Sequence, residues 1–158
     1  MRARSKRATG EKGISVIRPD LLAVKQALLD AGLEIYRAKD QEIQVAERVR
    51  LHIMDSGVRV VASSETEVRF TARSQRSDFP SVPPTELFQK VRGAVGTEAG
   101  ARGYREASAT TVEVKDPVDA DKILDVWHEI TYAKPTETLE QLVSEVRWAL
   151  ELDKYVSS

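Results

Sequence analysis

The chain has no cysteine among its 158 residues. This absence excludes a disulfide, a metal site built on thiolates and a cysteine nucleophile. It is consistent with a reducing compartment, and we therefore expect a cytoplasmic location. The chain also lacks the run of about 20 consecutive apolar residues that a membrane-spanning helix needs. We therefore expect no membrane partner.

Recognisable catalytic and cofactor motifs are also missing. No serine lies in a G-x-S-x-G motif, and the glycines of residues 93–103 match neither the dinucleotide-binding nor the P-loop spacing. The two histidines are His52 and His128, whereas a catalytic zinc usually has three protein ligands. We therefore expect no enzymatic activity, no catalytic residue, no metal and no cofactor. The alternatives are an acid–base pair of His128 with Glu129, and a metal site that His128 shares with His52.

Charge is distributed unevenly along the chain. Residues 1–13 hold five basic side chains and one acidic side chain, whereas the whole chain has a net charge of −1. This small, polar and basic stretch predicts a disordered tail, followed by a single domain over residues 14–158. A basic tail is typical of chains that contact nucleic acid, anionic lipid or an acidic partner. The alternative is a solvated segment with no binding role.

The apolar pattern of the first half predicts one helix and several strands. Apolar residues at helical spacing predict a helix over residues 19–31, followed by a short strand at residues 33–37. Residues 43–53 alternate between apolar and polar side chains, which predicts one half-buried strand. Residues 55–57, Asp-Ser-Gly, should then turn the chain. Two further alternating strands are expected within residues 58–73.

The second half predicts a helix, two strands and a final helix. A proline-rich connector precedes a helix that Thr85 should cap, and the glycines noted above should fray the end of that helix. A strand is expected over residues 107–114. Residues 119–133 fit a helix or a strand, but their β-branched and aromatic residues favour a strand that pairs with residues 107–114. With a last helix over residues 139–152, the fold class is α+β: an antiparallel sheet with helices, in the order α-β-β-β(β)-α-β-β-α.

Arginines recur on the polar side of the expected strands. We expect Arg50, Arg59 and Arg69, together with Arg48 and Arg73, to form a basic sheet face that contacts a partner. The alternative is an ordinary solvated face on which nearby glutamates balance the arginines. RNA-binding sheets usually present aromatic side chains for stacking, and this face offers no clear one.

The last helix carries a second candidate contact. Arg147 and Trp148 are adjacent there, and both residue types are enriched at the centres of protein interfaces. They therefore predict a helix seam at a dimer contact or a partner groove. The alternative is that the tryptophan packs in the core where this helix crosses the sheet.

The element order, the connector at residues 79–84 and the closing helix at residues 139–152 resemble the type III secretion chaperone-like fold, including the YbjN-like family of small bacterial domains. Proteins of that fold are typically non-enzymatic and often dimeric, and they bind extended segments of other proteins. The resemblance implies these properties for this chain. It implies no particular site residue, because no motif matches.

The expected function is therefore protein binding. We expect a bacterial, cytoplasmic adaptor or chaperone-like domain that forms a homodimer and binds a partner polypeptide through its sheet face, its sheet edge or a helix seam. A sheet with an unpaired edge can accept an extended peptide through backbone hydrogen bonds. The alternative is a nucleic-acid-associated protein that uses residues 1–13 and the arginine face.

Overall fold

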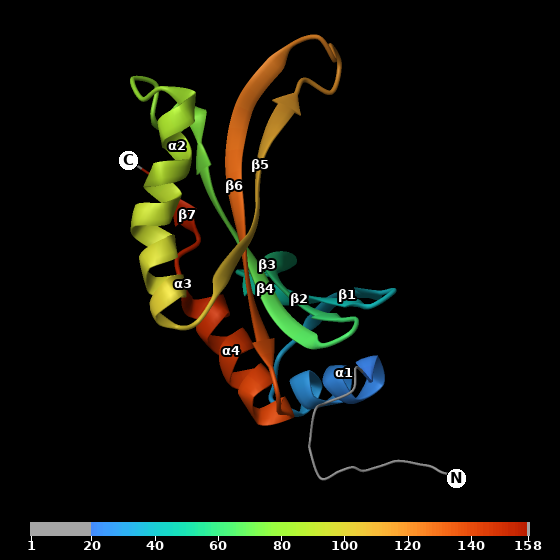
Figure 1. Cartoon of the computed structure of the whole chain (residues 1–158). Coiled ribbons are helices and arrows are strands. Elements are labelled where there is room, and N and C mark those ends of the chain that lie inside the picture. The colour runs from blue at the N-terminus through green and yellow to red at the C-terminus, as the bar shows by residue number, and fades with distance from the viewer. Residues whose placement is uncertain (1–19, 158) are drawn as a thin grey trace, which may run out of the picture. The chain divides into compact units, whose positions relative to one another are not determined.

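The computed structural model describes residues 20–157, which form an α+β fold (Figure 1). The helical segments are α1 (Leu21–Asp30), η1 (Arg76–Asp78), α2 (Pro84–Val91), η2 (Arg92–Gly96), α3 (Thr97–Ala101) and α4 (Leu139–Glu151). The strands are β1 (Ile35–Lys39), β2 (Glu42–Val49), β3 (His52–Ala62), β4 (Thr66–Gln75), β5 (Arg105–Lys115), β6 (Ile123–Thr136) and β7 (Tyr155–Val156). Since α2, η2 and α3 form one continuous run, the predicted fold class and order of elements are confirmed.

The seven strands belong to one hydrogen-bonded sheet, in the order β1-β2-β3-β4-β6-β5, and the short β7 pairs in parallel with β4. The chain forms two compact units, which are residues 20–68 with 135–150, and residues 69–134 with 151–157. The disordered tail predicted for residues 1–13 lies outside the described residues. The single domain over residues 14–158 stays a prediction.

In the first unit, helix α1 has a capped start and ends at a glycine. The Asp20 carboxylate accepts hydrogen bonds from the backbone N–H groups of Leu22 and Ala23, at 3.1 and 3.3 Å. These bonds satisfy donors that the first turn of a helix leaves free. Gly32 follows with φ +81°, a conformation that glycine adopts without strain and that stops a helix. The helix predicted over residues 19–31 is confirmed, with Leu21 as its first residue.

The chain turns after β2 earlier than the alternating pattern predicts. Arg50 and Leu51 form the turn, and Arg50 adopts φ +59°. The predicted single strand over residues 43–53 is therefore wrong, because two antiparallel strands share this segment. Leu51 is 93% exposed instead of lying on the dry face of the sheet.

The residues that were expected to form a turn, 55–57, form a bulge in β3 instead. Those residues lie inside β3, where the register against β2 shifts between Gln44 and Ala46. The Ser56 hydroxyl donates to the Val45 carbonyl at 2.6 Å within the bulge, and the adjacent glycine has φ +81°. The positive φ that glycine supplies serves to bend a strand here and does not reverse the chain.

Three aromatic rings form the centre of the second unit. The buried ring of Phe70 in β4 lies 5.1 Å from the ring of Tyr104, edge on, and 5.4 Å from the stacked ring of Tyr132. Such pairs add to the stability that burial of the rings supplies. Tyr132 belongs to β6, so the strand predicted at residues 119–133 is confirmed, with a later start at Ile123.

The run from α2 to α3 is longer than the sequence predicts. Its glycines were expected to fray the helix end, yet the chain stays helical to Ala101 and passes through a π-helical turn at η2. The prediction that this end frays is wrong. Gly96 has no side chain, so the helix can pack closely against β6, and this packing holds the run in its helical form. A Cβ atom on Gly96 would lie 2.7 Å from the Tyr132 hydroxyl oxygen, which is closer than carbon and oxygen can pack.

We predict that Gly96→Ala lowers the free energy of unfolding by about 1–3 kcal/mol, because the new methyl group collides with a buried phenol. Adding Tyr132→Phe should restore most of the loss. The hydroxyl that it removes makes no hydrogen bond within residues 20–157. Urea unfolding followed by circular dichroism measures both effects.

Gly100→Ala is the matched control. A Cβ atom at Gly100 meets nothing within 4 Å, so alanine there should stabilise the helix by up to about 1 kcal/mol. Equal effects of alanine at Gly96 and Gly100 would contradict the role of the close approach.

Candidate functional site

The arginines of the predicted basic face are mostly neutralised by carboxylates. In the first unit, Arg48 Nη2 lies 2.8 Å from Glu34 Oε2, and Arg59 Nε lies 3.6 Å from Glu42 Oε1. Arg50 is exposed at the turn that precedes β3, at the other end of that strand from Arg59. In this unit the predicted arginines therefore do not gather at one place.

The second unit contains the remaining two arginines of that face. Arg73 Nη1 lies 3.9 Å from Glu129 Oε2, and its guanidinium stacks 4.0 Å from the centre of the Trp127 ring. Arg69 is half-buried in β4. Arg73 therefore contacts side chains of the neighbouring strand β6, and Arg69 is only partly accessible to a partner.

Arg147 lies at a contact between two helices of the first unit, and the dimer contact or partner groove predicted for it stays a prediction. Arg147 of α4 donates from Nη2 to the carbonyl oxygen of Ala31, at 2.7 Å. Ala31 is the C-cap residue of α1, and carbonyl groups at this end of a helix carry partial negative charge and have no partner inside the helix. The Arg147 side chain therefore ties α4 to the end of α1. Trp148, the next residue, is half-buried.

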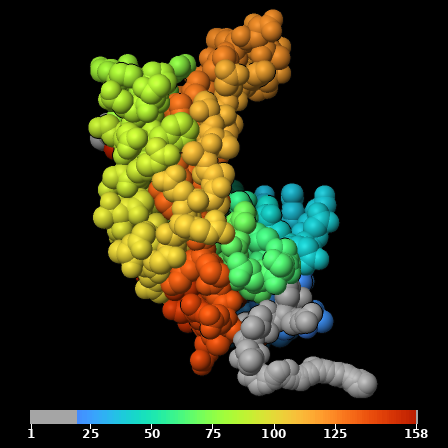
Figure 2. All heavy atoms as spheres, viewed as in Figure 1, coloured from blue at the N-terminus to red at the C-terminus, as the bar shows by residue number. Residues whose placement is uncertain are grey.

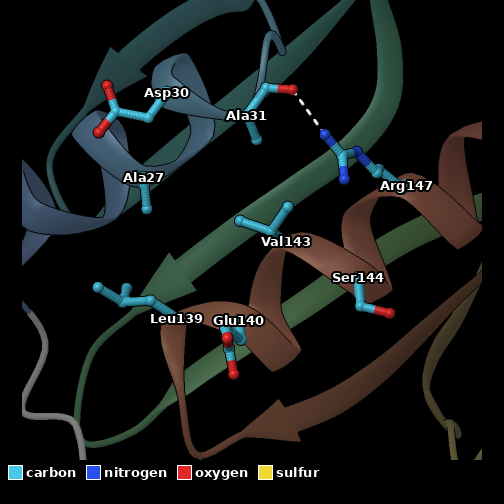
Figure 3. Close-up of a pocket in the computed structure, with 8 residues that line it drawn as sticks. All are labelled: Ala27, Asp30, Ala31, Leu139, Glu140, Val143, Ser144 and Arg147. Carbon is cyan, nitrogen blue, oxygen red and sulfur yellow. Dashed lines mark hydrogen bonds between the residues drawn. The ribbon is translucent and has the colours of Figure 1, made fainter.

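A groove of about 530 Å³ lies beside this hydrogen bond, between α1 and α4 (Figure 3). Small and apolar side chains make its floor, and charged side chains stand at its edge. Its lining residues are Ala27, Asp30, Ala31, Leu139, Glu140, Val143, Ser144 and Arg147. The volume falls within the range of roughly 300–1,000 Å³ that is typical of binding pockets.

The sequence explains why the groove is hollow. Ala27 and Ala31 are four residues apart, and so are Leu139 and Val143, which places each pair on one face of its helix. Two alanines leave space that larger side chains would fill. Figure 3 shows Ala27, Ala31 and Val143 facing the space between the helices.

The rim of the groove is largely acidic. The Asp30 carboxylate lies at the edge, where it accepts a hydrogen bond from Gln26 Nε2 at 2.8 Å. Glu140 is exposed at the start of α4. Among the described residues that line the groove, the cation is Arg147, and its guanidinium is engaged by the carbonyl at the C-cap of α1. Sequence reasoning named Arg147 but missed the other lining residues, whose only signal was the four-residue spacing of the two alanines.

His128 is a buried titratable group of the second unit. It is 4% exposed, its Nδ1 lies 3.3 Å from Thr111 Oγ1, and its ring packs edge-on against Phe88 at 5.0 Å. Its Nε2 has no hydrogen-bond partner in the part of the chain that the structure describes. Burial, and next the positive charge of Arg76, lower the pKa of His128 below its ordinary 6.5.

The histidine-based alternatives gain no support from this geometry. Adjacent residues of a strand point to opposite faces, and Glu129 is paired with Arg73. His52 is exposed at the start of β3. Within residues 20–157, no three His, Asp or Glu side chains group together to hold a metal. No helix in the same range is long and apolar enough to cross a bilayer.

We predict that the protein loses stability as the pH falls below about 6.5, in part through His128. An unfolded histidine binds a proton with a pKa of about 6.5, whereas the buried one resists protonation. The stabilising effect of the neutral ring is therefore complete above that pH and decreases below it. Urea unfolding between pH 7.5 and 5 measures the slope.

His128→Gln should flatten this dependence of the unfolding free energy on pH. The exposed His52→Gln serves as the control and should keep the wild-type slope. Parallel curves for the wild type and His128→Gln would contradict a buried neutral imidazole.

Comparisons of this chain with protein-family models, with curated proteins and with solved structures find no match. The interpretation of the groove and the strands therefore rests on their own geometry and chemistry.

Proposed function

We propose that this chain is a non-enzymatic, protein-binding adaptor of the cytoplasm, and that its α1–α4 groove receives an apolar segment of a partner polypeptide flanked by lysine or arginine. The observation that carries the proposal is the combination of an apolar floor with an acidic rim in one groove. The chaperone-like resemblance points in the same direction and stays a prediction.

The floor supports the choice of an apolar occupant. Ala27, Leu139 and Val143 present carbon to the groove, and transfer of apolar surface out of water supplies about 25 cal/mol per Å². Binding energy at protein interfaces is concentrated in a few side chains that fill such hollows. An aliphatic or aromatic side chain of the partner would be that anchor.

The rim supports the choice of basic flanking residues. Asp30 and Glu140 are negative, and the carbonyl end of α1 adds partial negative charge, while Arg147 is already engaged. Complementary charge steers association and rejects partners of the wrong sign. The basic residues 1–13 of this chain carry the same charge as those flanking residues, so occupation by its own tail is one outcome of the test below.

We predict that a fluorescein-labelled peptide with three Lys-Leu-Leu-Lys repeats binds the protein at least tenfold more tightly than the same peptide with glutamate in place of lysine. Fluorescence anisotropy at low and moderate salt measures both affinities. The double variant Asp30→Lys/Glu140→Lys should reverse the preference, because it inverts the charge of the rim.

Two control variants localise the binding. Glu151→Lys reverses one carboxylate at the exposed end of α4, outside the groove lining, and should leave both affinities unchanged, whereas either rim reversal alone should shift them. Val143→Glu should abolish binding of the lysine peptide, provided that circular dichroism shows an intact fold. Tighter peptide binding after deletion of residues 1–13 would identify the tail as a competing occupant. Equal binding of both peptides, or binding that ignores the rim variants, would overturn the proposal.

The nucleic-acid alternative draws its support from the charge of residues 1–13 and from Arg50. It gains less from Arg59, since that side chain lies beside Glu42. Binding of this kind should weaken steeply as salt rises, because bound counterions are released from the phosphates.

A further inference from the structure

Strand β5 is a long edge of the sheet. It has eleven residues, it ends the strand order, and it pairs with β6 on one side. All of its residues except Val114 are exposed. In Figure 2 the light-orange residues of this strand lie open at the surface along its length. The backbone N–H and C=O groups on its outer side can therefore pair with another strand.

The middle of β5 has none of the features that usually protect such an edge. Residues 107–112 are Ala-Ser-Ala-Thr-Thr-Val, with no charge and no proline. Proteins usually block exposed edges with lysine, proline or a bulge, and the register of β5 against β6 shifts near its two ends, between Glu106 and Ser108 and between Val114 and Lys115. Thr110, Thr111 and Val112 are β-branched, which suits an extended strand.

The pairing with β6 shows which side chains of β5 share a face. Ala109 pairs with Ile130, Thr111 with His128 and Glu113 with Val126, so these alternate residues lie on one face. The register shifts between Val114 and Lys115, but the extra residue there belongs to β6, so the alternation along β5 continues and Lys115 lies on the same face. The bulge at Ala107 returns Glu106 to that same face, since its partner Tyr132 is four residues from His128 in β6.

We propose that two copies of this chain associate by antiparallel pairing of their β5 strands, with Thr111 opposite Thr111 at the two-fold axis. This surface is separate from the groove, and the inference goes beyond the proposed function. The argument for a second copy as the occupant is that β5 is complementary to itself in charge.

Only a two-fold axis perpendicular to the sheet makes one continuous antiparallel sheet, and such an axis keeps each face on its own side. Opposed residues must therefore belong to the same face. An axis at Thr111 places Glu106 of each copy opposite Lys115 of the other, so that the interface holds two such pairs. An axis at Thr110 would instead place Glu106 opposite Glu113, and like charges in opposed positions are destabilising.

Glu106 is already paired with an arginine of the same unit, and Lys115 of the other copy would join that pair. Arg92 of η2 donates to both carboxylate oxygens, at 2.8 and 3.2 Å, which fixes the glutamate beside the edge. In the proposed register Ala109 lies opposite Glu113, so a small side chain leaves room for a larger one. Ser108 lies opposite Val114, and Thr110 opposite Val112.

The register can be tested by crosslinking because the chain has no cysteine. Thr111→Cys should form an intermolecular disulfide on mild oxidation, since opposed Cβ atoms in antiparallel strands are about 4.5–5.5 Å apart. Ala109→Cys alone should not, because its two copies would be roughly 13 Å apart along the strands. A mixture of Ala109→Cys and Glu113→Cys should crosslink. Non-reducing electrophoresis measures the dimer.

Val118→Cys is the control for unspecific oxidation, because Val118 is 96% exposed in the β5–β6 loop and lies outside the strand. It should give no more dimer than Ala109→Cys. Crosslinking at all positions alike would overturn the register.

Thr111→Cys also removes a contact with His128 inside the unit, so a second variant tests the dimer at a different residue. Lys115 lies at the exposed end of β5, and Lys115→Glu would place a glutamate of one copy opposite Glu106 of the other. Because like charges in opposed positions are destabilising, this variant should weaken dimerisation at least tenfold in analytical ultracentrifugation. The wild type should sediment as a dimer that weakens with salt. A wild type that stays monomeric at high micromolar concentration, or a Lys115→Glu variant with an unchanged dimer, would overturn the inference. Neither result would affect the peptide test of the groove.

Discussion

The close approach of Gly96 to the Tyr132 hydroxyl is the constraint on which the second unit depends. The helical run from α2 to α3 can lie this near to β6 only because residue 96 has no side chain. The ring of Tyr132 then stacks on Phe70, which in turn contacts Tyr104 at the start of β5. These contacts fix β6, and β6 fixes the register of β5. The exposed edge that we propose as a dimer interface is a consequence of that register.

Charge in this protein is paired locally, and this pairing moves the candidate binding surfaces away from the arginines. Arg48, Arg59 and Arg73 each lie beside a glutamate, and such exposed or half-exposed pairs contribute little to stability. They nevertheless cancel the charge that a basic binding face would need. The surfaces that we propose for binding are instead an apolar groove and a strand edge whose middle, residues 107–112, carries no charge.

The two proposals would reinforce each other. A dimer formed through β5 would carry two copies of the α1–α4 groove, and a partner with two suitable segments could engage both. The second contact is then intramolecular, so that weak binding at each groove could give a much tighter complex. Such an arrangement suits an adaptor, because affinity can be adjusted through either surface without a new catalytic or cofactor site.

The sequence by itself determined those elements whose signal is local. The apolar spacing of α1, the β-branched and aromatic residues of β6 and the apolar stripe of α4 all act within a few residues of the chain, and the α+β order follows from them. The positive φ of Gly57 was also predictable.

Only the tertiary structure decided how these signals were used. The same positive φ bends a strand because β2 pairs across it, and the glycines of the second helix permit close packing because Tyr132 lies opposite Gly96. The groove exists because two alanines of α1 face two aliphatic residues of α4, and the hydrogen bond from Arg147 to Ala31 joins residues 116 positions apart. Contacts over such separations depend on how the whole chain packs, which no short window of sequence contains.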